Sequence, residues 1–178
     1  MDYINNNKDL EIVSNQILIH PSSIPFKKLI EINYNINNCS NCGFYKLKND
    51  KWEYIYTEIN NNHIKANIGS GGTYIVFKDI NKPKISNIYP AIKSKYYSND
   101  IKNISFNVDD LNSGINAYKI KVELNNKELF FSYSAYRKLV ECELNSLLSP
   151  GTHQLTITIY DYSNNKQIIS GEFTILEK

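Results

Sequence analysis

Apolar and polar residues alternate along most of this chain, and short runs of turn-forming residues interrupt the alternation. The clearest case lies between Pro150 and Asn165. A Pro-Gly turn opens this stretch, an Asp-x-Ser-Asn-Asn loop closes it, and the apolar positions between them are Leu155, Ile157 and Ile159. Period-two alternation between two turn signals predicts a half-buried β-strand.

The same pattern recurs on both sides of a short polar segment that contains Pro83. Before it we expect strands at 11–20, 28–36, 44–47, 52–57, 63–68 and 73–78. After it we expect strands at 85–89, 102–108, 117–124, 129–133, 138–144, 152–160 and 168–176. Because no clear helical period interrupts the series, the sequence predicts an all-β protein of two tandem antiparallel β-sandwiches.

The polar segment sets the predicted domain boundary, because a proline stiffens it and few apolar residues occupy it. We predict a flexible lead-in at 1–9, a small β-sandwich at 10–79, a linker at 80–84 and a second sandwich at 85–178. Residues 136–148 also fit one face of a helix capped by Gly151. The alternation of Val140, Cys142 and Leu144 favours a strand followed by one helical turn.

Composition excludes several classes of protein. The net charge of +2 is small and evenly spread, so we expect no nucleic-acid partner. No apolar run reaches the ~18 residues of a membrane span, and residues 1–13 do not have the pattern of a signal peptide. The chain is therefore either cytoplasmic or the tail of a longer exported polypeptide. We expect a monomer.

Two motifs of the second half resemble bacterial immunoglobulin-like and fibronectin type III-like domains. They are the run from Asp109 to Ile115, DDLNSGI, and the pair PGTHQL from Pro150 and YDYSNN from Tyr160. The resemblance covers about 83–176 and implies an immunoglobulin/fibronectin III-like second sandwich. Asn164 stands where these domains often have glycine, and asparagine tolerates the left-handed conformation next best.

The first half resembles a module that often precedes such domains, through Trp52 after a turn and a Gly-Thr-Tyr run before Asp79. The pairing is similar to the C-terminal tail of large bacterial envelope proteins, some of them lysostaphin-like zinc metallopeptidases that cut peptidoglycan. The resemblance implies a periplasmic, cell-surface or secreted location within a longer chain. It therefore favours the exported alternative.

Oxygen-rich side chains in two loops are candidate calcium ligands: Asp109, Asp110 and Asp161, with Asn112 and Asn164 beside them. In an immunoglobulin-like domain these loops would share one end of the sheets. Calcium binds clustered oxygen ligands. Asx residues in turns more often hydrogen-bond their own backbone, so we favour loop locking and expect no cofactor.

Aromatic residues give a candidate glycan site, because Trp52, Tyr54 and Tyr56 share one face of a predicted strand. In a domain of this size such a face is more often core. The pair Cys39 and Cys42 forms a C-x-x-C without the second pair of a zinc ribbon or the following helix of a thioredoxin. A local disulfide or two plain thiols are the favoured alternatives, and Cys142 fits a buried core thiol.

No catalytic set is found, since His20, His63 and His153 are isolated and no serine has a glycine-flanked elbow. We therefore expect a non-catalytic spacer module of an exported envelope protein. The alternative is an accessory module that binds cell-wall glycan or another envelope protein domain, in the tail of a cell-wall peptidase. A cytoplasmic C-x-x-C redox protein is the third hypothesis.

Overall fold

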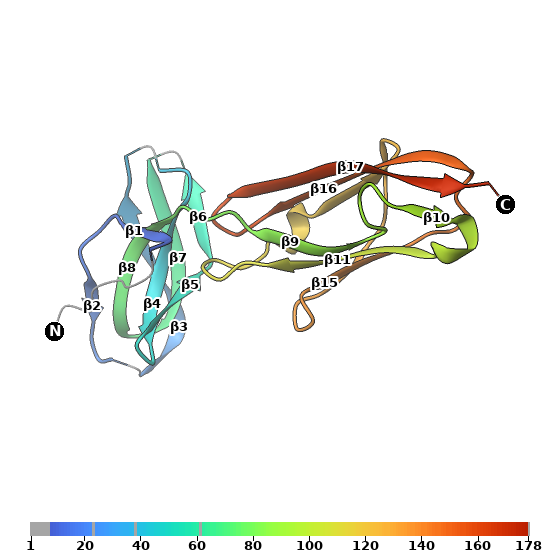
Figure 1. The fold of residues 1–178 in the computed structure, drawn as a ribbon. Coiled ribbons are helices and arrows are strands. Elements are labelled where there is room, and N and C mark those ends of the chain that lie inside the picture. Colours follow the sequence, from blue (N-terminus) through green and yellow to red (C-terminus); the bar gives the residue numbers. More distant parts are fainter. Residues whose placement is uncertain (1–7, 23, 38, 61, 178) are drawn as a thin grey trace. The chain divides into compact units, whose positions relative to one another are not determined.

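The computed structural model describes residues 8–22, 24–37, 39–60 and 62–177. These residues are mostly strand, and the prediction of an all-β sandwich fold is confirmed. The chain divides into two compact units (Figure 1). Unit 1 runs to Asn81 and also contains the loops 111–114 and 161–165, and unit 2 contains 82–110, 115–160 and 166–178. The boundary after Asn81 lies inside the predicted linker 80–84, whereas residues 1–7 of the predicted lead-in lie outside the described residues.

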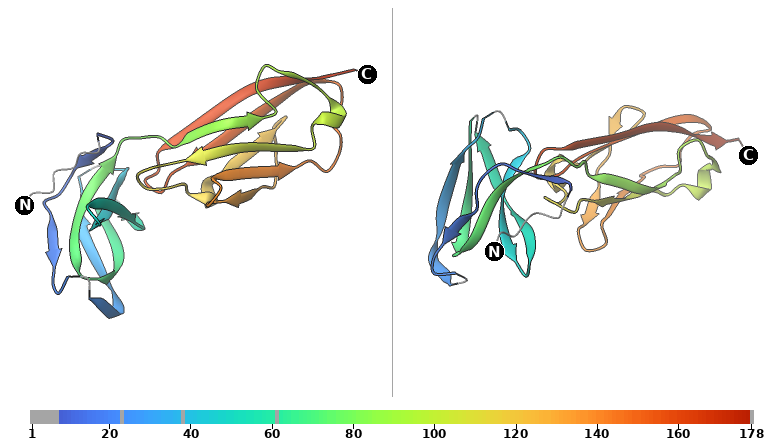
Figure 2. Two further views of the ribbon diagram at one scale, coloured as in Figure 1. Left: turned by 60° about the horizontal axis from the view of Figure 1, so that its bottom comes forward. Right: turned by 60° about the vertical axis from the view of Figure 1, so that its left-hand side comes forward.

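Unit 1 consists of two antiparallel sheets (Figure 2). One sheet has the order β1-β8-β4-β5, with β2 also paired to β8, and the other has the order β3-β7-β6. The strands are β1 (Leu10–Ile12), β2 (Ile17–Ile19), β3 (Pro25–Asn35), β4 (Cys42–Lys48), β5 (Lys51–Ile55), β6 (Thr57–Asn60), β7 (His63–Ser70) and β8 (Gly72–Asp79). The β4–β5 hairpin turns at Asn49 and Asp50, whose φ angles of 49° and 60° match the left-handed residues of a tight hairpin turn.

The larger sheet of unit 1 buries side chains on both of its faces. Phe44 and Val76 join Ile64 and Ala66 in the core shared with the smaller sheet. Their neighbours in β4 and β8 point to the opposite face, where Tyr45, Ile75 and Phe77 form a second cluster with Leu10 of β1. Trp52 and Tyr54 pack against this cluster. This explains why 42–45 of β4 and 74–77 of β8 are buried without alternation, because a strand covered on both faces has no need to alternate.

Unit 2 is also built from two sheets. Their orders are β14-β15-β11-β9 and β10-β17-β16-β12-β13. The strands are β9 (Lys84–Tyr89), β10 (Lys95–Tyr97), β11 (Asn103–Asp109), β12 (Lys121–Leu124), β13 (Lys127–Glu128), β14 (Ser132–Ser134), β15 (Leu139–Glu143), β16 (Gly151–Tyr160) and β17 (Lys166–Leu176). Short 3₁₀ turns lie at Ser98–Asp100 and Ala117–Lys119. All strand pairs of unit 2 are antiparallel except β10 with β17, which are parallel.

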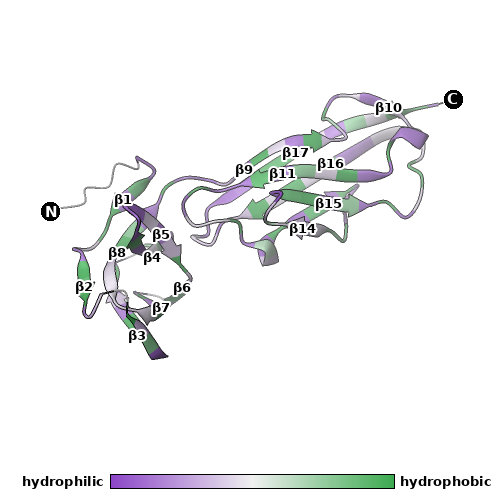
Figure 3. Ribbon diagram, turned by 90° about the horizontal axis from the view of Figure 1, so that it is seen from below, coloured by the Kyte–Doolittle hydropathy of each residue, from purple (hydrophilic) through white to green (hydrophobic). Residues whose placement is uncertain are grey.

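The core of unit 2 follows the period-two pattern read from the sequence. Figure 3 shows hydrophobic and hydrophilic residues alternating along its long strands. Phe106 and Val140 face Val122, Ile157 and Phe173 across the two sheets, all of them buried. The helical alternative for 136–148 is wrong, because β15 occupies the middle of this segment.

Two further details concern turns and membrane spans. Asn164, the residue in place of glycine, has a φ of 67°, the left-handed conformation expected for it. No helix in the described part of the chain could cross a membrane.

Candidate functional site: a buried carboxylate and amide network

The three aspartates predicted as calcium ligands fall in different surroundings. Asp109 is partly exposed in unit 2, where its carboxylate lies 2.6 Å from the ammonium group of Lys138. Asp110 is the last residue of that segment of unit 2, and Asp161 belongs to unit 1. Asp161 is fully buried. Burial of a carboxylate is costly unless hydrogen bonds replace the lost water, so its partners decide its role.

Asp161 is held by the loop in which it lies. The backbone N–H of Asn165 donates to Asp161 Oδ1 at 2.7 Å, and the Asn165 side-chain Nδ2 donates to Asp161 Oδ2 at 2.8 Å. The backbone N–H of Asn164 donates to the carbonyl oxygen of Asp161 at 3.2 Å, and Asn164 itself adopts the left-handed conformation. This is the loop locking that an aspartate in a turn provides.

Asp79 is a second fully buried carboxylate of unit 1, at the end of β8. The side-chain amide of Asn112 and the backbone N–H of Asn81 each donate to Asp79 Oδ1 at 3.0 Å. Asn165 Nδ2 also donates to the Asp79 carbonyl oxygen at 3.2 Å. One asparagine side chain therefore bonds both aspartates.

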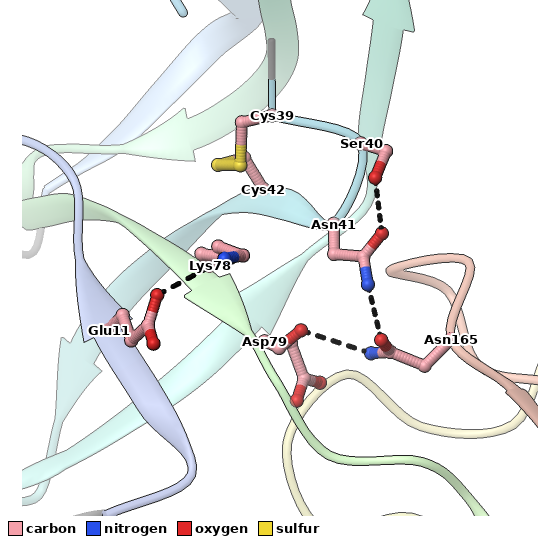
Figure 4. The surroundings of a disulfide bond; sticks show 8 residues. All are labelled: Glu11, Cys39, Ser40, Asn41, Cys42, Lys78, Asp79 and Asn165. Carbon is pink, nitrogen blue, oxygen red and sulfur yellow. Dashed lines mark hydrogen bonds and ion pairs between the residues drawn. A yellow bond between two sulfur atoms is a disulfide. The ribbon is translucent and has the colours of Figure 1, made fainter. Parts of the chain in front are cut away.

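A disulfide closes the loop that completes the network (Figure 4). Cys39 and Cys42 are joined, and Asn41 lies between them. The Asn41 carbonyl accepts the N–H of Asp79 at 2.9 Å, and the Asn41 side-chain amide donates to Asn165 Oδ1. Cys42 is fully buried in the core of unit 1, so the disulfide fixes this loop against that core.

The chemistry of the network is that of a structural lock. Its donors are neutral amides, and its acceptors are the two carboxylates together with neutral carbonyl oxygens. The bonds that end on a carboxylate are charge-assisted and roughly twice as strong as the neutral ones. Carboxylate oxygens of Asp79 and Asp161 approach within 4.8 Å of each other, so these are the residues of unit 1 that could hold a hard cation. Such a cation would have to compete with the amide donors. Calcium binding stays a prediction.

Sequence reasoning placed Asp161 and Asn112 in a cluster but assigned no role to Asp79, Asn41 or Asn165. The predicted first domain ends at Asp79. The signal available for it was an aspartate that ends a strand with a continuous apolar run at 74–77. Asn112 and Asn165 lie 33 and 86 residues further along the chain, so no local pattern connects them to it.

The three side chains of the predicted aromatic site differ in their exposure to solvent. Trp52 and Tyr54 are partly buried, and their rings pack edge-on against Phe77 and Tyr45 at centroid distances of 5.4 Å. Burial raises the pKa of Tyr54 to about 12. Tyr56 follows the end of β5 and is 65% exposed, with the ring of Tyr162 6.1 Å away. Tyr56 is thus the exposed member of the three.

The remaining candidate groups have structural surroundings. His153 is buried, with its ring nitrogens 2.9 Å from Asn125 Nδ2 and 2.8 Å from the Ser149 carbonyl, and it stacks on Phe173. Cys142 is a free thiol in the core of unit 2, and burial raises its pKa to about 11. Neither residue is positioned as a nucleophile or a base.

Comparisons with known proteins give similarities of fold only. No protein-family model and no curated protein matches the sequence. Among solved structures, CopC from Methylosinus trichosporium OB3b is 11% identical with a TM-score of 0.44, and the match covers 53% of this chain and 93% of CopC. An endo-beta-1,4-mannanase from Thermotoga petrophila has 13% identity and a TM-score of 0.43, covering 56% of this chain and 21% of the enzyme. Dimeric latent PorU from Porphyromonas gingivalis has 13% identity and a TM-score of 0.42, covering 84% of this chain and 20% of PorU.

Proposed function

We propose that this chain is a non-catalytic structural module of a larger exported bacterial envelope protein, and that it carries load between its ends. The strand order of unit 2 supports an immunoglobulin-like assignment. If β9, β11, β12, β13, β14, β15, β16 and β17 are lettered A, B, C, C′, D, E, F and G, the sheets read A-B-E-D and C′-C-F-G. Rigidity comes from the apolar core that the two sheets share.

The observation that carries the proposal is the parallel pairing of β10 with β17. Lys95, Tyr96 and Tyr97 lie opposite Thr174, Ile175 and Leu176. The chain enters unit 2 through β9 at one end of the strands. It leaves through β17 at the opposite end (Figure 1). A force that separates these ends acts along the strands, so the β10–β17 hydrogen bonds must shear together instead of opening one at a time.

Single-molecule force spectroscopy tests this arrangement through two variants at Tyr96. Tyr96→Pro and Tyr96→Ala both remove the side chain, but only proline removes the backbone donor of the ladder. We expect Tyr96→Pro to unfold at a clearly lower force than Tyr96→Ala. Equal forces for the two variants would show that the β10–β17 ladder does not bear the load.

Glycan binding is the second candidate function, and the exposed ring of Tyr56 beside Tyr162 favours it. Aromatic rings bind the apolar faces of sugars by stacking, so an exposed ring beside a partly buried one is a suitable surface. The test is retention of the protein on purified peptidoglycan. Tyr56→Ala should abolish retention if this surface binds glycan. Trp52→Ala is less suitable, because it also removes packing against Phe77, and a loss of retention could then come from unfolding.

The exported location is part of the proposal and has its own test. Antibody detection of this chain in fractions of the source cells should find it in the envelope or the medium. Detection in the cytoplasm alone would overturn the envelope assignment. The load-bearing role would then be decided by the force measurements alone.

A further inference from the structure

Unit 2 carries an open groove of about 860 Å³, lined by both apolar and polar side chains, which the proposed function does not use. It lies between the segment that connects β13 to β14 and the segment 144–149 that follows β15. Its floor is formed by side chains that pack against the core of unit 2, namely Leu124, Leu129, Phe131, Leu144 and Leu148. The groove is therefore a place where the core of the sandwich reaches the surface.

Phe130 stands at the rim of this groove with 95% of its surface exposed, and Leu147 is 62% exposed on the same rim. An exposed phenylalanine beside a groove with an apolar floor is unusual on a monomer, because burying such a ring is strongly favourable. The surface thus has a protruding apolar group and an apolar recess side by side.

The strands beside the groove are the end strands of their sheets. β13 ends one sheet and β14 ends the other. Among the described residues no further strand pairs with either of them on its outer side. No strand in the described part of unit 2 therefore covers the outer edge of β13 or β14.

The charges on the rim are of both signs. Glu128 and Glu141 lie 4.0 Å and 3.7 Å from Lys121 and Arg137. Lys127 and Glu143 also line the groove, and in the described part of the chain neither forms an ion pair. One acid and one base are thus available for an outside partner.

We propose that the groove is filled by a second copy of this chain in a two-fold symmetric dimer. A two-fold interface uses the same patch on both subunits, so the patch must complement itself. Here each copy offers a ring, Phe130, and a groove to receive it, together with Lys127 and Glu143 to pair with the partner's Glu143 and Lys127. For a partner of different sequence, a surface would need only a ring or a groove, and only an acid or a base. This surface has both members of each pair, as a two-fold interface requires. The inference concerns unit 2 alone and is independent of the proposed function.

Sedimentation velocity of the full chain tests the proposal. We expect reversible dimerisation in about the micromolar range, as for a small interface. Phe130→Ser should weaken it on the order of a hundredfold, the effect of a central aromatic contact. Tyr136→Ser is the matched control, since Tyr136 is 98% exposed and does not line the groove, and it should change the dimerisation constant less than about threefold. Both side chains are exposed, so both variants should fold.

A charge-exchange experiment distinguishes this interface from any other. Lys127→Glu gives a rim with only acidic free groups and Glu143→Lys a rim with only basic ones, so each variant alone should be monomeric. An equimolar mixture should form a heterodimer, because each acid again meets a base. A wild-type chain that stays monomeric up to about 0.5 mM would overturn the proposal and assign the groove to another occupant, as would a mixture that fails to associate.

Discussion

The side chain of Asn165 allows the buried network to be tested by a single substitution. In Asn165→Ala the backbone N–H still reaches Asp161 Oδ1, but the side-chain bonds to Asp161 Oδ2, to the Asp79 carbonyl and from Asn41 are lost. A hydrogen bond to a charged group contributes about 1.5–3 kcal/mol and a neutral one about 0.5–1.5 kcal/mol. One charged and two neutral bonds are lost, so the expected loss of unfolding free energy for unit 1 is about 2.5–6 kcal/mol.

Urea unfolding followed by tryptophan fluorescence measures this loss in unit 1 itself. Trp52 is the single tryptophan of the chain and packs against the second cluster of unit 1. With a urea dependence of about 1–3 kcal/mol per molar, the midpoint should fall by roughly 2 M. Asn33→Ala is the control, because Asn33 is exposed and its bond to Glu31 lies on the surface.

The comparison of these two variants decides whether the network holds unit 1 together. Asn33→Ala should change the unfolding free energy by no more than about 0.5 kcal/mol. If Asn165→Ala were equally mild, the two buried aspartates would not depend on the amides that surround them, and the structural lock would be refuted.

Three further predictions follow from local geometry. A Cβ on Gly71 would lie 2.0 Å from the Pro21 carbonyl oxygen, whereas a Cβ on Gly69 would meet nothing closer than 3.6 Å. Gly71→Ala should therefore lower the urea midpoint of unit 1 strongly and Gly69→Ala only slightly, and equal midpoints would contradict this geometry. Because burial raises the pKa of Cys142 to about 11 and the thiol has no exposure, iodoacetamide at about pH 8 should modify it only after unfolding, as mass spectrometry can follow. Calcium should not raise the midpoint of unit 1 above its value with a chelator, since amides already bond Asp161; a rise that Asp161→Asn removes would instead support the calcium prediction.

The sequence was most informative where one face of a strand is buried and the other is solvated. β11, β15 and β16 are such strands, and their alternation identified them. It was less informative at β10, which has three residues and no alternation, and which is held by pairing with residues almost 80 positions away.

The candidate site was only partly accessible to sequence reasoning, for a related physical reason. Turn chemistry explains why Asp161 and Asn164 belong to a tight loop, and this is local information. The partnership of Asp79 with Asn112 and Asn165 exists only because the fold brings together three segments distant in sequence. Trp52 and Tyr54 share a face as expected. Tyr56 does not lie on that face, because β5 ends before it and β6 begins after it.

The load-bearing role of unit 2 is tested most directly by the direction in which it is pulled. Handles at Lys84 and Leu176 load the unit along its strands, over a segment whose extension should release roughly 300 Å of chain. Handles at Gly151 and Leu176 instead open the β16–β17 hairpin from its end, where Gly151 lies opposite Ile175. We predict a markedly higher unfolding force in the first geometry. Equal forces in the two directions, or a lower force along the strands, would contradict the proposal that this module is built to carry load.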